Sequence, residues 1–72
     1  MISFESEKSI NNIYLFIDKE GIDDLIGYLN YIKHNNESFH LVLGNEIEEN
    51  PIIKGNSVVG HVKLIYLDEQ DK

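Results

Sequence analysis

One segment of this chain carries a helical pattern, and that single segment limits the fold more than any other feature. Apolar residues recur at spacings of three and four, which gives one apolar side to a helix. The apolar positions are Ile22, Leu25, Ile26, Leu29 and Ile32. Asp18 can cap the N-terminus, with Glu20 in the first turn, and asparagines at positions 35 and 36 favour the end of the helix. A lone helix of this kind is expected to pack on a β-sheet.

Four segments are typical of β-strands. The first two, Ile2–Glu5 and Ile13–Ile17, are separated by a polar stretch and fit a hairpin. A third strand is predicted at Phe39–Leu43 and a last one from Val58 to Leu67. The order ββαββ therefore predicts an α+β fold, in which the single helix packs on one face of a four-stranded, mostly antiparallel sheet.

The segment between the last two strands, from Gly44 to Ser57, is predicted to be a long exposed loop. Asn50 and Pro51 favour a turn within it, and Ile52–Ile53 can form a short extra strand. Three glutamates make the loop acidic: Glu46, Glu48 and Glu49. The last five residues, 68–72, are predicted to form a charged tail.

Length and charge narrow the classes of function. The 72 residues predict one domain, residues 1–72, because independently folding units are rarely much smaller. Thirteen acidic residues against six lysines give a formal charge of −7, which argues against a nucleic acid partner. With no cysteine, the chain has no disulfide framework, thiol nucleophile or thiolate metal site. No secretory signal and no apolar run of about 18 residues is found, so we expect a cytoplasmic protein without membrane contact.

The sheet face opposite the helix should be open to solvent or to a partner, because only one helix is available to cover the sheet. Alternation along the strands predicts which side chains point toward the helix. These are Ile13, Leu15, Ile17, Phe39, Leu41, Leu43, Val62, Leu64 and Tyr66. The helix-free face would then carry Tyr14, Phe16, His40, Val42, His61, Lys63 and Ile65. Exposed aromatic and aliphatic clusters often mark contact surfaces, but the long loop or a second copy could also cover this face, and a bulge could exchange the two faces.

His40 and His61 are the strongest candidates in the sequence for a metal-binding or proton-transfer site. A register that places Leu43 opposite Val58 would place His40 directly opposite His61, although a long loop does not fix that register. Such a pair could bind a metal, relay a proton or respond to pH. A metal site needs a third ligand, which no acidic residue is placed to supply. We therefore expect hydrogen bonding, packing or partner contact, with no metal, cofactor or catalytic residue.

Other residues are candidates for contact with a protein. Tyr31 falls opposite the apolar side of the helix and could anchor a partner, although single exposed aromatics are common. The acidic run at residues 46–49 could meet a basic surface or simply be solvated. Nucleophile motifs and phosphate-binding glycine loops are absent, so the sequence does not predict an enzyme.

Most of the chain, about residues 2–67, resembles the immunity protein 32 family of bacterial polymorphic toxin systems. Ile13–Ile32, reading IYLFIDKEGIDDLIGYLNYI, is similar to the strand, acidic turn and helix of that family. His40–Leu41, Gly44–Glu49 and His61–Lys63 are similar to its later strand, acidic loop and final strand. Family members carry a Pro and a Trp-Gly-Gly stretch before the acidic loop, and this chain has neither there. The resemblance implies a small acidic protein that binds a cognate toxin and blocks it.

The leading hypothesis is thus a small acidic immunity protein that binds a cognate toxin and neutralises it by occlusion. Charge complementarity predicts that this toxin is basic. The alternative is a structural or assembly module that homodimerises through its open sheet face. The third and weakest hypothesis is a metal or pH sensor based on histidine. The residues expected to contact a partner are Tyr14, Phe16, Tyr31, His40, Glu46, Glu48, Glu49, His61 and Lys63.

Overall fold

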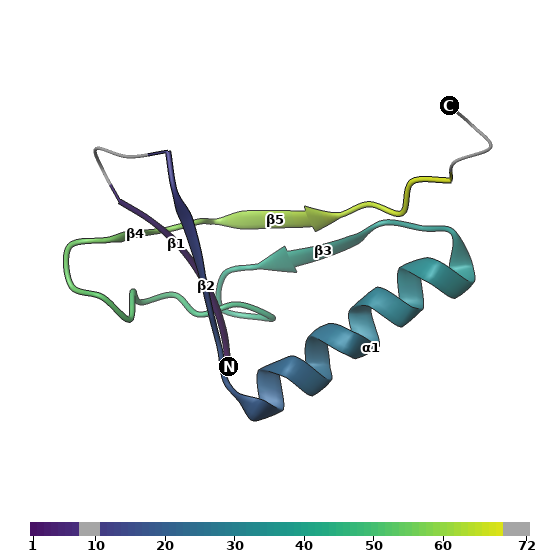
Figure 1. The fold of residues 1–72 in the computed structure, drawn as a ribbon, viewed down its shortest axis with the longest axis horizontal. Coiled ribbons are helices and arrows are strands. Elements are labelled where there is room, and N and C mark those ends of the chain that lie inside the picture. Colours follow the sequence, from purple (N-terminus) through teal and green to yellow (C-terminus); the bar gives the residue numbers. More distant parts are fainter. Residues whose placement is uncertain (8–10, 69–72) are drawn as a thin grey trace.

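The computed structural model describes residues 1–7 and 11–68, and these parts contain one helix and short strands of mostly antiparallel pairing (Figure 1). The elements are β1 (Ile2–Ser6), β2 (Ile13–Ile17), α1 (Lys19–Asn35), β3 (Phe39–Val42), β4 (Ser57–Val58) and β5 (His61–Leu64). The predicted α+β class is confirmed. Residues 69–72 of the predicted tail, and residues 8–10 of the polar stretch, lie outside the described residues.

The strands divide into two sheets where one was expected. One has the order β2-β1-β4 and the other pairs β3 with β5. The predicted last strand is interrupted at Val59 and Gly60, so its first part joins β1 and its second part joins β3. Val59 donates a backbone hydrogen bond to Phe4, and Gly60 accepts one from Leu43, so the interruption itself is held from both sides. Ile52–Ile53 forms no strand.

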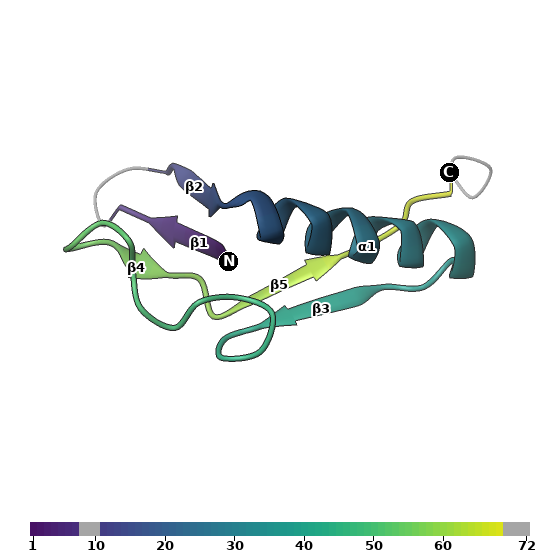
Figure 2. The same ribbon diagram turned by 90° about the horizontal axis from the view of Figure 1, so that it is seen from below.

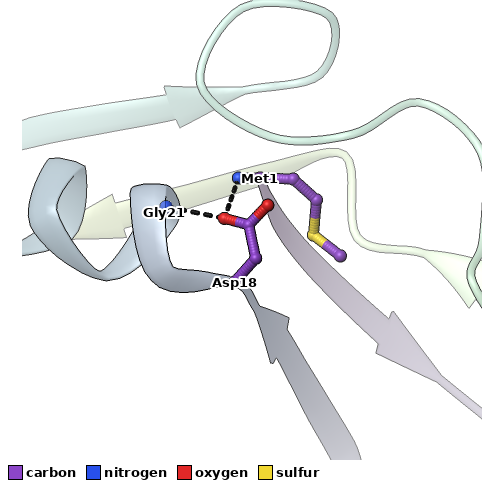
Figure 3. A network of polar contacts seen from close by, with 3 residues as sticks. All are labelled: Met1, Asp18 and Gly21. Atoms are coloured by element: carbon purple, nitrogen blue, oxygen red, sulfur yellow. Dashed lines mark hydrogen bonds and ion pairs between the residues drawn. The ribbon is translucent and has the colours of Figure 1, made fainter.

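The helix begins where the sequence predicts (Figure 3). The Asp18 carboxylate accepts a hydrogen bond from the backbone N–H of Gly21 at 2.7 Å, which satisfies one of the free N–H groups of the first turn. The same oxygen, Oδ1, forms an ion pair with the amino group of Met1. At the other end Asn36 adopts the left-handed conformation, with φ 52°, which stops the helix. Both ends therefore follow from local residue chemistry.

The core lies where the helix, β3 and the start of β1 meet. Ile2, Leu41 and Ile47 form its buried centre, and Leu41 is fully inaccessible. Tyr28 of α1 stacks on Phe39 of β3 with ring centroids 4.5 Å apart. Figure 2 shows α1 lying over the β3 and β5 pair, with β1 and β2 beyond its N-terminal end. The predicted alternation is confirmed along β3 and β5. Leu43, directly after β3, and Val62 and Leu64 of β5 also pack against the core, as expected.

The prediction that Ile13, Leu15 and Ile17 of β2 point toward the helix is wrong for two of these residues. Ile17 packs against the core, but Ile13 is 63% exposed and Leu15 is also exposed. The reason is that β2 belongs to the other sheet and extends past the N-terminus of α1, so the helix covers only its last residue. Tyr66 was also expected to point inward; it is exposed and lies beyond the end of β5.

The helix itself is covered on only part of its apolar side. Ile32 is buried and Leu25 packs against the core. Ile22, Ile26 and Leu29, on the adjoining side, remain exposed. Within the described residues, no helix has the length and apolar character needed to cross a membrane.

Candidate functional site

The two histidines meet, although not in the expected register. Nδ1 of His40 lies 2.7 Å from Nε2 of His61, and the ring centroids are 4.8 Å apart. Along the ladder, however, His40 is opposite Lys63 and Val42 is opposite His61. The register that would place the histidines directly opposite, which the sequence did not fix, is therefore not the one formed, and the pairing differs from it by two residues. A shift of two keeps every side chain on its own face, so the rings still reach each other diagonally.

This pair can share one proton between its ring nitrogens, with one ring donating and the other accepting. Both rings are exposed on the side of β3 and β5 that faces away from α1. Over residues 1–7 and 11–68, no three side chains of His, Asp or Glu gather to hold a metal ion. The contact shown is thus a hydrogen bond that joins the two strands on their outer face.

The helix-free face is smaller than expected, because it includes only the strands of one sheet. His40, Val42, His61, Lys63 and Ile65 are all exposed, as predicted. Tyr14 and Phe16 lie on β2, in the other sheet, and the structure does not bring them into this face. They are half-buried and close to each other, with ring centroids 6.3 Å apart.

Tyr14 and Phe16 share their sheet face with two buried polar residues. Phe16 is opposite Ser3, and Tyr14 is opposite Glu5, in the pairing of β1 with β2. Ser3 and Glu5 are fully inaccessible to solvent. The loop at residues 52–56 contacts this face, so the long loop covers part of it, which was one of the alternatives left open by the sequence. Tyr14 also donates a hydrogen bond from its hydroxyl to Glu7.

Glu5 is a buried charged residue that holds the long loop in place, and sequence reasoning missed it. Its carboxylate accepts hydrogen bonds from the Ser3 hydroxyl at 2.8 Å, from the backbone N–H groups of Ile52 at 2.6 Å and Ile53 at 3.3 Å, and from the Asn56 amide at 3.2 Å. Burial alone would raise the pKa of Glu5, but these hydrogen bonds together lower it below its ordinary value. Glu5 therefore stays charged while buried, and it fixes the loop onto β1. Glutamate is rarely fully buried, so the residue type alone gives no signal for this position.

The acidic run after β3 forms a tight turn on the surface. Ile47 is buried in the core and anchors this turn, and Gly44 takes a φ of 81° that suits glycine. Glu48 donates a backbone hydrogen bond to Ile2, and Gly44 donates one to Ile47. The backbone of the turn is thus held at several points, and its glutamate side chains are presented from a fixed base.

A hollow of about 360 Å³ lies beside this turn. Four of the residues that line it carry a carboxylate, and Met1 also contributes. The lining residues are Met1, Asp24, Gly44, Asn45, Glu46, Ile47, Glu48, Glu49 and Asn50. Glu46 is half-buried and accepts a hydrogen bond from the Val42 backbone at 3.0 Å, while Glu48 and Glu49 are exposed. The sequence predicted the acidic run, but it could not show that Asp24 from α1 faces it.

Carboxylates that line a hollow suit a cationic side chain. Arginine and lysine form charge-assisted hydrogen bonds with carboxylates, and such bonds are stronger than those between neutral groups. Because the carboxylates come from two elements, α1 and the turn after β3, a single cationic group could contact both. The arrangement can therefore bind a basic protein surface.

Tyr31 is exposed as predicted, but it already has partners within the chain. Its ring contacts the edge of Phe39 with centroids 5.8 Å apart, and its hydroxyl donates a hydrogen bond to Glu37 at 2.7 Å. The hydrogen bond to Glu37 raises the pKa of the Tyr31 hydroxyl. The side chain is therefore positioned by its neighbours and lies apart from the residues that line the hollow.

No family model matches the sequence, and no curated protein and no solved structure matches the chain. The resemblance to the immunity protein 32 family stays a prediction.

Proposed function

We propose that this protein binds and neutralises a cognate basic toxin, as an immunity protein does, by occluding the toxin's active site. The observation that carries this proposal is the hollow in which Asp24, from α1, and the glutamates of the turn after β3 face the same space. The immunity role itself rests on the resemblance of the sequence, to which the hollow adds a surface of suitable chemistry.

The turn supports this proposal because it is rigid and charged. Ile47 and the backbone hydrogen bond from Glu48 to Ile2 fix it to the core, so little conformational entropy is lost when a partner binds. The formal charge of −7 would attract a basic protein from a distance and raise the association rate. Occlusion needs no catalytic group in this chain.

The experiment is coexpression with candidate toxins encoded near the gene. Rescue of growth, followed by measurement of affinity and association rate with the purified toxin, tests binding and neutralisation separately. The variant Glu48→Gln/Glu49→Gln removes two charges from the hollow without removing any hydrogen bond described above. We expect its affinity to fall about tenfold, with a slower association rate and a weaker dependence on salt.

The matched control is Glu20→Gln/Asp23→Asn, which removes two exposed charges of α1 that do not line the hollow. It should reduce affinity by less, since it changes only the long-range attraction. The proposal is contradicted if no nearby toxin is neutralised. The assignment to the hollow is contradicted if the control weakens binding as much as the variant of the turn does.

A further inference from the structure

β2 is an edge strand, and one of its edges has no partner strand in the part of the chain that the structure describes. The three-stranded sheet has the order β2-β1-β4, so β1 occupies one edge of β2 and leaves the other open. Figure 2 shows β2 on the side of β1 away from β4, with α1 leading off from its end. An open edge presents a row of N–H and C=O groups that can pair with another strand.

The pairing of β1 shows which residues of β2 face this open edge. The carbonyl of Phe4 accepts the backbone N–H of Val59, directly after β4, so the backbone groups of Phe4 face β4. Phe4 is opposite Leu15 in the pairing of β1 with β2. Because these two residues exchange no hydrogen bond, Leu15 turns its N–H and C=O to the open edge. Ile13 and Ile17, two residues away on either side, do the same.

β2 also lacks the features that protect edge strands from pairing. Edge strands are usually protected by short length, by charged side chains or by proline. β4 has two residues, β5 carries Lys63, and at β3 the N–H of Val42 already donates to the carboxylate of Glu46. β2 has five residues, IYLFI, without a charge, a proline or a glycine. Among the strands in residues 1–7 and 11–68, β2 is therefore the one best suited to pair with another strand.

The residue types of β2 are symmetric about its central residue. From Ile13 to Ile17 they are aliphatic, aromatic, aliphatic, aromatic and aliphatic, with Leu15 in the middle. A twofold interface uses the same patch on both copies, so each position meets the position at equal distance on the other side of the axis. A second copy of β2 thus matches β2 in residue type at every position.

We propose that two copies of the chain associate by antiparallel pairing of their β2 edges, with the twofold axis at Leu15. Leu15 lies opposite Leu15 of the second copy, and Ile13 lies opposite its Ile17. Since all these residues turn their backbone groups to the open edge, each such pair exchanges two hydrogen bonds. The two three-stranded sheets then join into one continuous sheet.

The side chains of β2 fit this arrangement on both faces of the sheet. Ile13 is 63% exposed and Leu15 is 42% exposed, and pairing brings aliphatic residues of the second copy beside them. On the other face, Tyr14 lies opposite Phe16 of the second copy. Aromatic pairs across neighbouring strands are stabilising.

Charge also favours β2 as the place where two copies meet. Each copy has a formal charge of −7, so two copies repel each other over much of their surface. β2 has no charge, and Asp18, directly after it, lies opposite Asn12 of the second copy in this register. The Asp18 carboxylate is also paired with the amino group of Met1. No residue that lines the hollow belongs to β2, so the pairing does not use the proposed toxin-binding surface.

The first test is the mass of the full chain in solution, measured by light scattering over a wide concentration range. We expect twice the monomer mass of 8.3 kDa at high concentration. Leu15→Lys places two like charges at the axis and should raise the dissociation constant at least about tenfold. Val42→Lys is the matched control, because Val42 is 38% exposed and lies on β3. Circular dichroism checks that both variants remain folded.

The second test is hydrogen exchange of the backbone N–H groups, followed by NMR at several protein concentrations. The N–H groups of Tyr14 and Phe16 face β1, whereas those of Ile13, Leu15 and Ile17 face the open edge. Raising the concentration should slow exchange most at the three outward positions. In Leu15→Lys this dependence on concentration should disappear at Ile13 and Ile17.

Three results would overturn the proposal. One is a chain that stays monomeric up to about 1 mM. Another is a dimer that Val42→Lys dissociates and Leu15→Lys does not, which would place the interface on the helix-free face. The last is a dimer in which the outward N–H groups exchange at rates independent of concentration. None of these results bears on the toxin-binding proposal, which is tested by the variants of the turn at residues 48 and 49.

Discussion

Glu5 and Ile52 are 47 positions apart in the sequence, and the carboxylate of Glu5 accepts the backbone N–H of Ile52 at 2.6 Å. With Ser3, Ile53 and Asn56 as further donors, this contact joins β1 to the long loop. A buried charge without partners would be destabilising, but this one is surrounded by donors. The loop is thus held in place by one side chain of the first strand.

The first prediction concerns the amide variant Glu5→Gln. Its NH₂ group would face donors where an oxygen now accepts, so at least one buried hydrogen bond would be lost. We expect the free energy of unfolding to fall by roughly 1–3 kcal/mol in urea titrations. Glu48→Gln, at an exposed site, is the control and should change stability little. Equal stabilities for the two variants would mean that Glu5 does not hold the loop.

The second prediction is a loss of stability in acid that depends on Glu5. The pKa of this carboxyl is lowered from its ordinary value of 4.5 by its hydrogen bonds, against the effect of burial. Its contribution is therefore present above pH 4.5 and is lost as the pH falls through the lower pKa of the folded state. Unfolding midpoints measured across this range should fall less steeply for Glu5→Gln than for the unchanged chain. An identical pH dependence would contradict the prediction.

The third prediction concerns Met1 and Asp18. The hydrogen bond to Asp18 raises the pKa of the Met1 amino group above its ordinary value of 8.0, and the same contact lowers the pKa of Asp18. The contribution of the amino group is present below pH 8.0 and is lost as the pH rises through its raised pKa. Thermal unfolding should show this decrease in the unchanged chain. Asp18→Asn should show a smaller one, and a decrease of the same size would indicate another group.

The fourth prediction contrasts two glycines of α1. A Cβ at Gly27 would meet no atom within 4 Å, so Gly27→Ala should raise the free energy of unfolding by about 0.5–1 kcal/mol through higher helix propensity. A Cβ at Gly21 would collide with the carbonyl oxygen of Met1 and lie 3.0 Å from Ile17. Gly21→Ala should therefore destabilise the chain by roughly 1–3 kcal/mol. Urea titration of both variants checks the sign, and a stabilised Gly21→Ala would show that β1 moves away at little cost.

Local patterns predicted the helix well, because its determinants lie within a few residues of one another. Asp18 caps it by accepting the N–H of Gly21, and Asn36 ends it, so the capping contacts are local, although Asp18 also pairs with the distant Met1. Alternation also predicted the two faces of β3 and β5. It failed for Ile13 and Leu15, because it reports which residues share a face and cannot tell which part of that face a helix will cover.

The strand register, the division into two sheets and the position of Asp24 could not be predicted, because they depend on contacts between residues far apart in the sequence. The register of His40 and His61 followed a long intervening segment rather than a short turn, so a shift of two positions left the hydrophobic pattern unchanged. The division into two sheets depends on the interruption at Val59 and Gly60. A glycine within a strand pattern indicates a bulge or a bend, but it does not tell that the strand changes its partner. Of the candidate site, the acidic run was predicted, but the position of Asp24 beside it required the packing of α1.

Residues 57–64 pass from one sheet to the other, and this affects the order in which the chain can fold as it is synthesised. Figure 1 shows β4 and β5 as successive parts of one run, which pairs first with β1 and then with β3. A ribosome makes this run after all its partner strands, so neither sheet can be completed before residues 57–64 have been released. Folding should then be one late cooperative event, governed by the closing of long loops.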